Sequence, residues 1–320
     1  MRKLYTVGEA LIDFIPKQRE VALKEVQEFE RRVGGAPLNV ACVAGKLGAE
    51  VNMVTQVGRD AFGDLIIDTL KENNVDVSHV QTTEQANTAL AFVSLKNDGE
   101  RDFSFYRKPS ADMLYKIENT ENVKTSKEDI LYFGSVSLNT DDMRKAHDAL
   151  IEKHQQTGGI IFFDPNVRLP LWEDEAECSA VINTYIPHAD IIKISDEELE
   201  FITGIKDETE AVQSLFKGNI KVVVYTKGKN GSELYVNGEK LYEAPGLNVK
   251  ALDTTGAGDA FSGAFLFQLL NRDEESLECF LRKEFETVLT LSNRLGAYQT
   301  LNYGAVENLP TYQNLLELDI

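Results

Sequence analysis

Short, continuous apolar runs alternate with helix-like stretches through the C-terminal two-thirds of the chain. Strands that are apolar throughout are typical of a parallel sheet that is covered by helices on both faces. The pattern therefore predicts an α/β fold with a mostly parallel central sheet. The expected strands span residues 130–134, 159–164, 189–194 and 221–226, and the helical stretches between them span residues 141–154, 175–186 and 196–203.

Polar side chains stand where three of these strands end. Asp164, Ser195 and Thr226 each close or directly follow an apolar run. In open α/β sheets, ligands bind beyond the carboxyl ends of the parallel strands. We therefore expect these three residues to line one crevice.

Two segments, near residues 11–33 and 88–107, break the alternation because they are strand-like with little helix between. Residues 89–95 are expected to form a strand, residues 97–100 a turn and residues 101–106 the returning strand. An ordinary hairpin insertion is one explanation. We favour the other, a small antiparallel sheet that covers the crevice as a lid, because both segments flank polar residues of the kind found in sites.

The composition is that of a soluble globular protein. The chain has 320 residues, of which 42% are hydrophobic and 27% charged, which is ample for a buried core. No stretch rich in Pro, Gly or Ser divides the chain, and no internal repeat is visible. We expect residues 1–320 to form a single domain, with a lid subdomain from about residues 11–33 and 88–110.

The charge and the cysteines narrow the range of partners. A net charge of −19 argues against nucleic-acid and anionic-membrane partners, which bind clustered Lys and Arg, but it does not exclude a phosphate-bearing substrate. Cys42, Cys178 and Cys279 show neither metal-site nor disulfide spacing. The N-terminus leads straight into a strand-like run, without a signal-peptide apolar region or a membrane-length segment. We therefore expect a cytoplasmic protein.

The run from Asp253 to Phe261 carries the clearest chemistry. Gly256, Ala257 and Gly258 directly precede Asp259, and an apolar helix follows. Small residues let an anion approach the unpaired N–H groups of a helix N-terminus. An acid beside such a pocket suits a proton acceptor for a hydroxyl that attacks a phosphate. The competing interpretation is a Gly-rich loop with a helix cap, which we disfavour because of the flanking Asp253-Thr254-Thr255.

A second Gly-rich turn, Gly34-Gly35, opens another helix, and Asn39 lies in its first turns. Paired glycines allow the backbone to approach a ligand closely. Asp13 follows the first strand. Together, Asp13 and Asn39 are the kind of pair that forms hydrogen bonds with adjacent hydroxyls of a sugar. Either residue alone would be interpreted as a turn residue.

Two arginines, Arg107 and Arg168, follow strand-like runs. Arginine presents a rigid fork of donors that suits phosphate or polyol oxygens. The alternative for either residue is membership of a surface ion pair. Arg168 carries more weight because it follows an expected strand of the central sheet.

Glu198 and the turn after residue 226 are candidates for the nucleotide side. Glu198 begins a helix, where it either helps to hold a hydrated Mg²⁺ or completes a helix cap with Ser195. The Thr226-x-Gly228-x-x-Gly231 turn precedes a strand, so it is neither a dinucleotide fingerprint nor a Walker loop, but it can offer groups to a nucleotide phosphate. The stretch 291–297 is either the edge of an adenine pocket or an ordinary helix.

Over essentially its whole length the chain resembles the PfkB, or ribokinase-like, sugar kinases. The resemblance rests on residues 34–39 and 253–259, which look like that family's two characteristic motifs in order and separation. Within the family, residues 8–13, 105–114 and 164–172 look most like fructokinases. The resemblance implies a ribokinase-like three-layer α/β/α sandwich with a small β-sheet lid, and ATP-dependent phosphorylation of D-fructose to fructose 6-phosphate.

The resemblance also implies residue roles, Mg²⁺ with the ATP, and K⁺ near Asp253. The family often has Asn-x-x-Glu near the Mg²⁺; here Ser195 replaces the Asn while Glu198 remains, which weakens Ser195 as a site residue. The implied roles are Asp259 as base with an anion hole at Gly256, Ala257 and Gly258; sugar contacts from Asp13, Gly34, Gly35, Asn39, Arg107 and Arg168; nucleotide contacts from Thr226, Gly228, Gly231, Asn293 and Lys193; and metal contacts from Glu198 and Asp253.

Three other functions compete with this one. A 2-keto-3-deoxygluconate kinase shares the fold but should want additional positive charge for its substrate's carboxylate. A sugar-binding regulatory protein without transferase activity is disfavoured because Asp259 is present. A nucleoside kinase fits the sugar-side residues less well. Whichever holds, exposed lid strands invite pairing with a second copy, so we expect a homodimer through the lid.

Overall fold

The computed structural model describes residues 2–18, 21–95, 101–273 and 276–317. Ten strands of this part of the chain form the central sheet, in the order β14-β13-β12-β11-β10-β9-β1-β4-β5, with β6 paired to β4. All pairings are parallel except those that join β12, β13 and β14. The strands are β1 (Lys3–Val7), β4 (Glu50–Gly58), β5 (Val75–Asp76), β6 (Val80–Thr83), β9 (Ile130–Phe133), β10 (Ile160–Phe163), β11 (Ile191–Ser195), β12 (Val222–Thr226), β13 (Ser232–Val236) and β14 (Glu239–Ala244).

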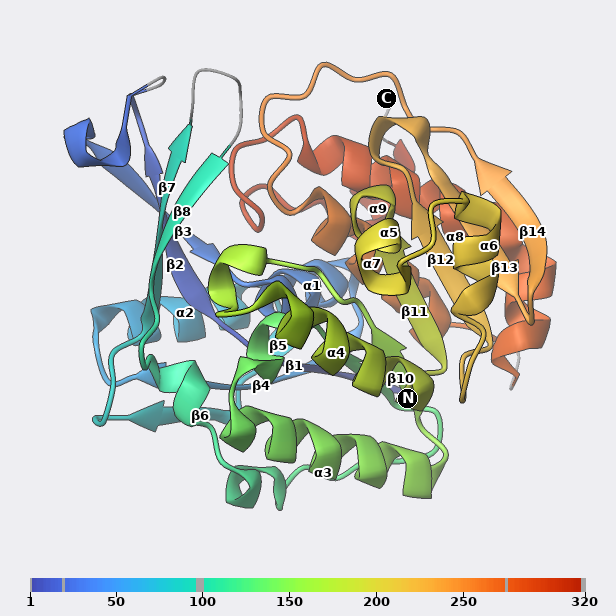
Figure 1. The fold of residues 1–320 in the computed structure, drawn as a ribbon, viewed down its shortest axis with the longest axis horizontal. Helices are drawn as coiled ribbons and strands as arrows, with labels where there is room; N and C mark the ends of the chain where they lie inside the picture. The colour runs from blue at the N-terminus through green and yellow to red at the C-terminus, as the bar shows by residue number, and fades with distance from the viewer. Residues whose placement is uncertain (1, 19–20, 96–100, 274–275, 318–320) are drawn as a thin grey trace.

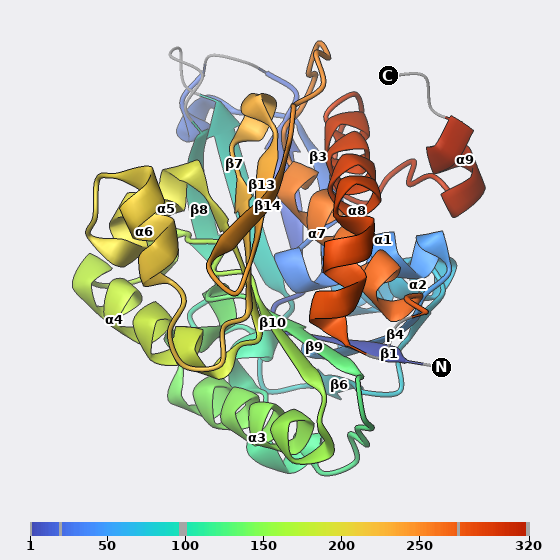
Figure 2. The same cartoon turned by 90° about the vertical axis from the view of Figure 1, so that its right-hand side faces the viewer.

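Helices cover both faces of this sheet, which gives three layers (Figure 2). One face is covered by α1, α2, α7 and α8, and the other by α3, α4, α5 and α6. The predicted strands and helices are confirmed to within a few residues. The helices are α1 (Ala36–Leu47), α2 (Ala61–Glu72), α3 (Asp141–Thr157), α4 (Glu175–Tyr185), α5 (Asp196–Thr203), α6 (Glu208–Ser214), α7 (Ala257–Leu270), α8 (Leu277–Gln299) and α9 (Tyr312–Glu317).

Burial on both faces explains why the central strands are apolar throughout. Along β10, Phe162 packs into the core beneath α1 and α7, whereas its neighbour Phe163 packs into the core beneath α3 and α4. Successive side chains of a strand point to opposite faces, so a strand covered twice needs apolar residues at every position. Among the described residues, no helix is both long enough and apolar enough to span a membrane.

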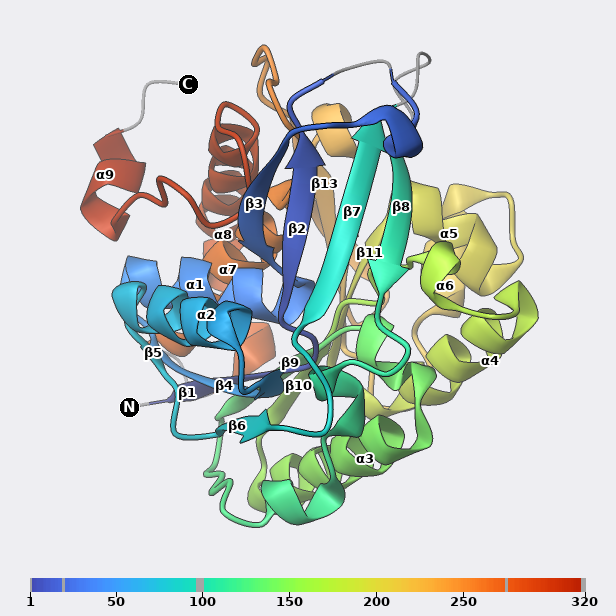
Figure 3. The same ribbon diagram turned by 90° about the vertical axis from the view of Figure 1, so that its left-hand side faces the viewer.

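A second sheet, the lid, stands to one side of the central sheet (Figures 1 and 3). It comprises β2 (Leu11–Pro16), β3 (Phe29–Gly34), β7 (Ala89–Leu95) and β8 (Arg101–Tyr106), in the order β3-β2-β7-β8. The expectation of a purely antiparallel sheet is wrong for its central pair, because β2 and β7 run parallel. Each hairpin is antiparallel within itself, but the two lie side by side with their first strands in the same direction. The turn predicted at residues 97–100 lies outside the described residues.

Candidate active site

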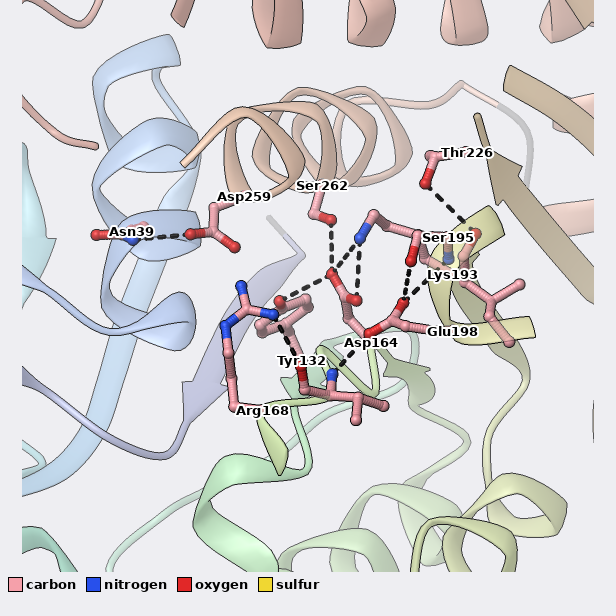
Figure 4. Close-up of polar contacts among 12 residues, drawn as sticks. Asn39, Tyr132, Asp164, Arg168, Lys193, Ser195, Glu198, Thr226, Asp259 and Ser262 are labelled. Atoms are coloured by element: carbon pink, nitrogen blue, oxygen red, sulfur yellow. Dashed lines mark hydrogen bonds and ion pairs between the residues drawn. The ribbon is translucent and has the colours of Figure 1, made fainter. Parts of the chain in front are cut away.

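The carboxyl ends of neighbouring parallel strands lie along one edge of the central sheet. The pairing of β10 with β11 and of β11 with β12 brings the ends of these strands together, and Ser195 stands opposite Thr226. Asp164 follows β10 directly. Three residues from separate parts of the sequence therefore share one edge, as the alternation of strands and helices predicted, and the N-terminus of α7 faces this edge (Figure 4).

The loop before α7 is shaped by its own residues and by the segment at residues 304 and 305. Gly256 has φ +75, and a Cβ there would come within 2.6 Å of the Cβ of Ala305. The Asp253 carboxylate accepts hydrogen bonds from the Thr255 amide and hydroxyl, at 3.0 and 2.7 Å, and from the Gly304 amide, at 3.2 Å. Only glycine combines this left-handed backbone with the lack of a side chain. Asp253 therefore acts here as the organiser of the loop, and its predicted contact with a cation stays a prediction.

The first turn of α7 has the features expected of an anion pocket. Ala257, Gly258 and Asp259 are its first three residues, where N–H groups lack intrahelical acceptors and the helix dipole is positive. The Ala257 amide donates to the Thr254 carbonyl over 3.3 Å. That hydrogen bond is long. To take part in an anion hole, the Ala257 amide would give up this bond and donate to the anion instead.

Asp259 is half-buried and is linked to α1. Its Oδ2 accepts a hydrogen bond of 2.7 Å from Nδ2 of Asn39 (Figure 4). Burial is the main cause that raises the pKa of Asp259 above its usual value; the charge of Asp164 raises it further, while the Asn39 hydrogen bond, Lys193 and Arg168 oppose the rise. A carboxylate with a raised pKa is a better proton acceptor.

Asn39 is buried, with 4% of its surface exposed, yet only half of its amide has a partner in the described structure. The side-chain oxygen Oδ1 accepts no hydrogen bond from any described residue. Most buried polar atoms are paired. The Oδ1 atom of Asn39, an acceptor beside Asp259, therefore agrees with the prediction that Asn39 binds a sugar hydroxyl.

The two glycines before α1 make room for the residues around them. A Cβ on Gly34 would come within 2.3 Å of Oδ2 of Asp13, and one on Gly35, which has φ +106, within 2.5 Å of the Glu9 carbonyl oxygen. Gly34 and Gly35 are thus required by the close approach of β2 and of the end of β1. Asp13 lies on β2 with its side chain half-buried.

The two arginines predicted to hold the sugar have different surroundings. Arg107 is 3% exposed; its Nε and Nη2 donate to Oδ2 of Asp112 at 2.9 and 2.5 Å, and its Nη1 to the Val136 carbonyl at 3.2 Å. Arg168 is exposed, and its Nη1 donates to the carbonyl of the adjacent Val167 at 2.9 Å. Arg168 is therefore the accessible cation of the two, and Arg107 is part of a buried ion pair.

Four of the predicted nucleotide-side residues, Thr226, Gly228, Gly231 and Asn293, gather where β12, β13 and α8 meet. The fifth, Lys193, lies on β11, where it forms a buried ion pair with Asp164. Thr226 ends β12 and donates to the Ile194 carbonyl at 3.4 Å, and Asn293 of α8 accepts from Ser232 at 2.9 Å. Gly228 has open space where a Cβ would lie, whereas a Cβ on Gly231 would come within 2.0 Å of the Ala244 carbonyl oxygen. Asn293 and Gly231 have structural roles in joining these elements, and their contacts with nucleotide remain predictions.

Glu198 shows the capping arrangement that was one of its two interpretations. Its Oε2 accepts from the Ser195 amide at 3.0 Å and hydroxyl at 2.7 Å, and its Oε1 accepts from the Val167 amide at 2.6 Å (Figure 4). Among the described residues, no group of three or more His, Cys, Asp or Glu could hold a metal ion. Direct contact of Glu198 with a metal stays a prediction.

Sequence reasoning missed a buried polar cluster at the same edge. The Asp164 carboxylate, 1% exposed, accepts hydrogen bonds from Lys193, Tyr132 and Ser262. Asp164 was visible as a polar residue after a strand, but Tyr132 and Ser262 lie within apolar runs and gave no sign of their contacts. Glu9 was also missed as a site residue: it accepts from the Ala36 amide at 3.2 Å and from Ser137 at 2.8 Å, and burial raises its pKa.

A lid beside a sheet covered on both faces, with an acid at the start of the helix that faces the strand ends, is the architecture expected of a ribokinase-like sugar kinase. Family comparison agrees: the chain belongs to the pfkB family of carbohydrate kinases, whose model matches residues 1–312.

Relatives of known name are similar over nearly the whole chain. Probable fructokinase-2 of Arabidopsis thaliana is 41% identical over 307 residues, which cover 95% of this chain and 92% of that protein. Fructokinase-2 of Solanum lycopersicum is 40% identical, with 98% of this chain and 95% of that protein covered. A double mutant of the Vibrio cholerae O395 fructokinase, solved with fructose, ADP and a potassium ion, superposes with a TM-score of 0.89 at 30% identity, covering 99% of this chain and 98% of that one.

Proposed function

We propose that this chain is an ATP-dependent kinase that phosphorylates D-fructose to fructose 6-phosphate. The observation that carries the proposal is the Asn39–Asp259 pair at the start of α7, where an acid with a raised pKa stands next to a helix N-terminus. Relatives named fructokinase at about 40% identity over nearly the full chain, and the Vibrio cholerae structure with fructose and ADP bound, support the choice of substrates.

The proposed reaction is a direct transfer of the terminal phosphoryl group of ATP. Asp259 accepts the proton of the attacking sugar hydroxyl as that oxygen bonds to phosphorus, and the bond to the leaving ADP oxygen breaks. The N–H groups of Gly256, Ala257 and Gly258 stabilise the negative charge on the group in flight. Asp13 and Asn39 hold the sugar so that its hydroxyl stays in line, and Arg168 supplies an accessible positive charge.

Cations complete the proposal. Mg²⁺ would be brought by the ATP phosphates, since it keeps several waters and takes few protein carboxylates, and Glu198 would contact it through water. K⁺ would lie by the loop at Asp253, which is joined to the next loop by the bond from the Leu252 amide to the Thr300 carbonyl at 2.8 Å. Both cations would help to neutralise charge near the transferred group.

The test is a coupled assay on the purified protein with ATP and Mg²⁺, across a panel of sugars that includes D-fructose and 2-keto-3-deoxygluconate. We expect fructose to be turned over fastest, because a keto-acid would want additional positive charge for its carboxylate, whereas Arg107 is paired with Asp112 and only Arg168 of the two predicted arginines is accessible. Faster turnover of the keto-acid would refute the proposal in favour of the second kinase. Fructose binding without phosphorylation would favour a regulatory protein.

A homodimer through the lid is part of the proposal. Phe14, Phe29, Phe92 and Tyr106 form a lid aromatic patch, in which Phe92 lies 4.8, 5.3 and 5.2 Å from the rings of Phe14, Phe29 and Tyr106. Phe14 follows Asp13 on the same strand, so the patch is on the face away from Asp13. Tyr106 is 64% exposed, and exposed apolar patches of this kind mark interfaces.

Sedimentation at working concentration tests the dimer. We expect the wild-type protein to sediment as a dimer, Tyr106→Glu to shift toward monomer, and Ile117→Glu, at an exposed apolar residue outside the lid, to leave the dimer intact. A wild-type monomer would contradict the proposal.

We further propose a cytoplasmic location, supported by the three cysteines, all of which are free thiols.

A further inference from the structure

A buried ion pair lies beneath the first turn of α7. Nζ of Lys193, on β11, is 3.0 and 2.9 Å from the two carboxylate oxygens of Asp164, at the end of β10. The side chain of Lys193 is 8% exposed and that of Asp164 is 1% exposed. Burying two charges is costly, and apolar residues often serve stability equally well. Stability alone therefore does not explain why this ion pair is present.

Asp164 also binds the helix that carries the proposed base. Its Oδ2 accepts from the Tyr132 hydroxyl at 3.2 Å and from the Ser262 hydroxyl at 3.1 Å (Figure 4). Ser262 follows Asp259 by one turn of α7, so the two side chains lie on neighbouring parts of one helix face. A single carboxylate thus joins β9, β10 and β11 to the start of α7.

The other member of the pair lies against the anion pocket. A Cβ on Gly258 would stand 3.6 Å from Nζ of Lys193, so the ammonium is in contact range of the pocket's backbone with no side chain between them. A fixed positive charge at this point would add to the helix N–H groups in stabilising charge on a phosphoryl group.

We propose that Asp164 is a positioning residue for phosphoryl transfer, which anchors α7 through Ser262 and holds the Lys193 ammonium at the anion pocket. The inference rests on the proposed function and adds two residues to it. Ser262 acts through the helix that carries Asp259, and Asp164 acts through both Ser262 and Lys193. The group that the pocket receives is the terminal phosphoryl of a nucleoside triphosphate.

The first test is Ser262→Ala, which removes the anchor to α7 without leaving a charge unpaired. Its matched control is Thr120→Val, because the Thr120 hydroxyl is also buried but donates within its own short helix, at the Ile117 carbonyl, outside the proposed site. Loss of one hydrogen bond that aligns the base should lower kcat about tenfold, while KM for fructose and ATP stays within about twofold. The control should keep kcat within about twofold. Equal kcat in both variants would overturn the proposal.

The second test uses the pH dependence of kcat/KM. The charged and titratable groups that face Asp259 are Asp164 on β10, Lys193 on β11, Tyr132 on β9 and Arg168 after β10. Asp164 raises the pKa of Asp259 and Lys193 lowers it. The acid limb of the profile should therefore move to lower pH in Asp164→Asn and to higher pH in Lys193→Met. A purely structural pair would lower the melting temperature and leave the limb in place.

The outcomes separate this inference from the proposed function. If the wild-type protein fails to phosphorylate fructose, the proposed function fails. If the wild-type protein is active, and Ser262→Ala matches Thr120→Val, only the positioning role fails. Should Asp164→Asn or Lys193→Met fail to fold, the comparison of Ser262→Ala with Thr120→Val still decides, because neither of these variants leaves a buried charge unpaired.

Discussion

The lid and the α7 edge, meaning the first turn of α7 with the ends of β10 and β11, are built in different ways. The buried apolar cluster of the lid is small, with Leu11, Ala89 and Ala91 at its centre, and its aromatic patch is partly exposed. The α7 edge is joined by buried hydrogen bonds and an ion pair around Asp164. Regions with few buried contacts open most readily. The contrast indicates a fixed edge and a more easily displaced lid. In the proposed function, the edge would perform the chemistry and the lid would hold and cover the sugar.

An ion pair connects the lid to the loop before α7. Arg32 of β3 pairs in register with Asp13, and its Nη1 is 3.3 Å from Oε1 of Glu307. Glu307 belongs to the segment that also supplies Ala305, which packs against Gly256, and Gly304, which donates to Asp253. The lid strand beside Asp13 is thus linked to the loop that shapes the anion pocket.

Asp259→Ala should have the largest effect, because it removes the proton acceptor from the fixed edge. We expect kcat to fall by about 10³-fold or more, at the upper end of what a positioned base contributes. The measurement is steady-state kinetics with fructose and ATP. Retained turnover would refute the assignment of the base.

Gly256→Ala should come next, since it disturbs the edge by geometry alone. The new methyl group would meet Ala305, and the left-handed backbone costs about 1 kcal/mol or more for a residue other than glycine. We expect kcat to fall at least about tenfold. Gly204→Ala is the matched control: its φ of +71 is close to the +75 of Gly256, but nothing lies within 4 Å of its Cβ position. Similar kinetics for both variants would show that crowding at Ala305 is unimportant.

Glu307→Gln should have a smaller effect, on the lid side. The pair with Arg32 is partly exposed, at 21% and 26%, and such pairs contribute up to about 1 kcal/mol. We expect KM for fructose to rise by about threefold to fivefold with little change in kcat. The charge exchange Arg32→Glu with Glu307→Arg should restore part of the loss relative to Arg32→Glu alone. A double variant no better than the single one would argue against a link through this pair.

His147 lies on α3, away from both regions, and should affect stability but not catalysis. Burial lowers its pKa from about 6.5 to about 4. The unfolded chain therefore binds a proton that the folded chain does not, so stability falls as pH drops from about 6.5 toward 4. Between pH 7 and pH 5, the free energy of unfolding measured in urea should fall by about 2 kcal/mol less in His147→Gln than in the wild type. Its kcat should match the wild type, and an unchanged loss of stability would contradict this account.

Local patterns were enough to predict most of the fold. Continuous apolar runs separated by helices marked β9 through β12, because burial on both faces demands such runs. The parallel pairing of β2 with β7 was not predictable, since it joins two hairpins that are far apart in sequence. Nothing local distinguishes that pairing from an antiparallel one.

The candidate site likewise has features that the local sequence predicts and features that it does not. The small residues before Asp259 and the Ser195–Glu198 cap can be read within a few residues of sequence, and both are present in the structure. The partners of Asp164 could not be found this way. Tyr132 and Ser262 are polar only at one atom each, lie in apolar runs, and meet Asp164 from 32 and 98 residues away.

The central claim is that the α7 edge performs the chemistry while Asp13, on the lid, holds the sugar. The most direct test compares fructose binding by calorimetry in Asp259→Ala and Asp13→Ala, each alongside its turnover. We predict that Asp259→Ala binds fructose within about fivefold of the wild type although its turnover is lost, and that Asp13→Ala loses at least about tenfold in affinity. Equal loss of fructose affinity in the two variants would contradict the division.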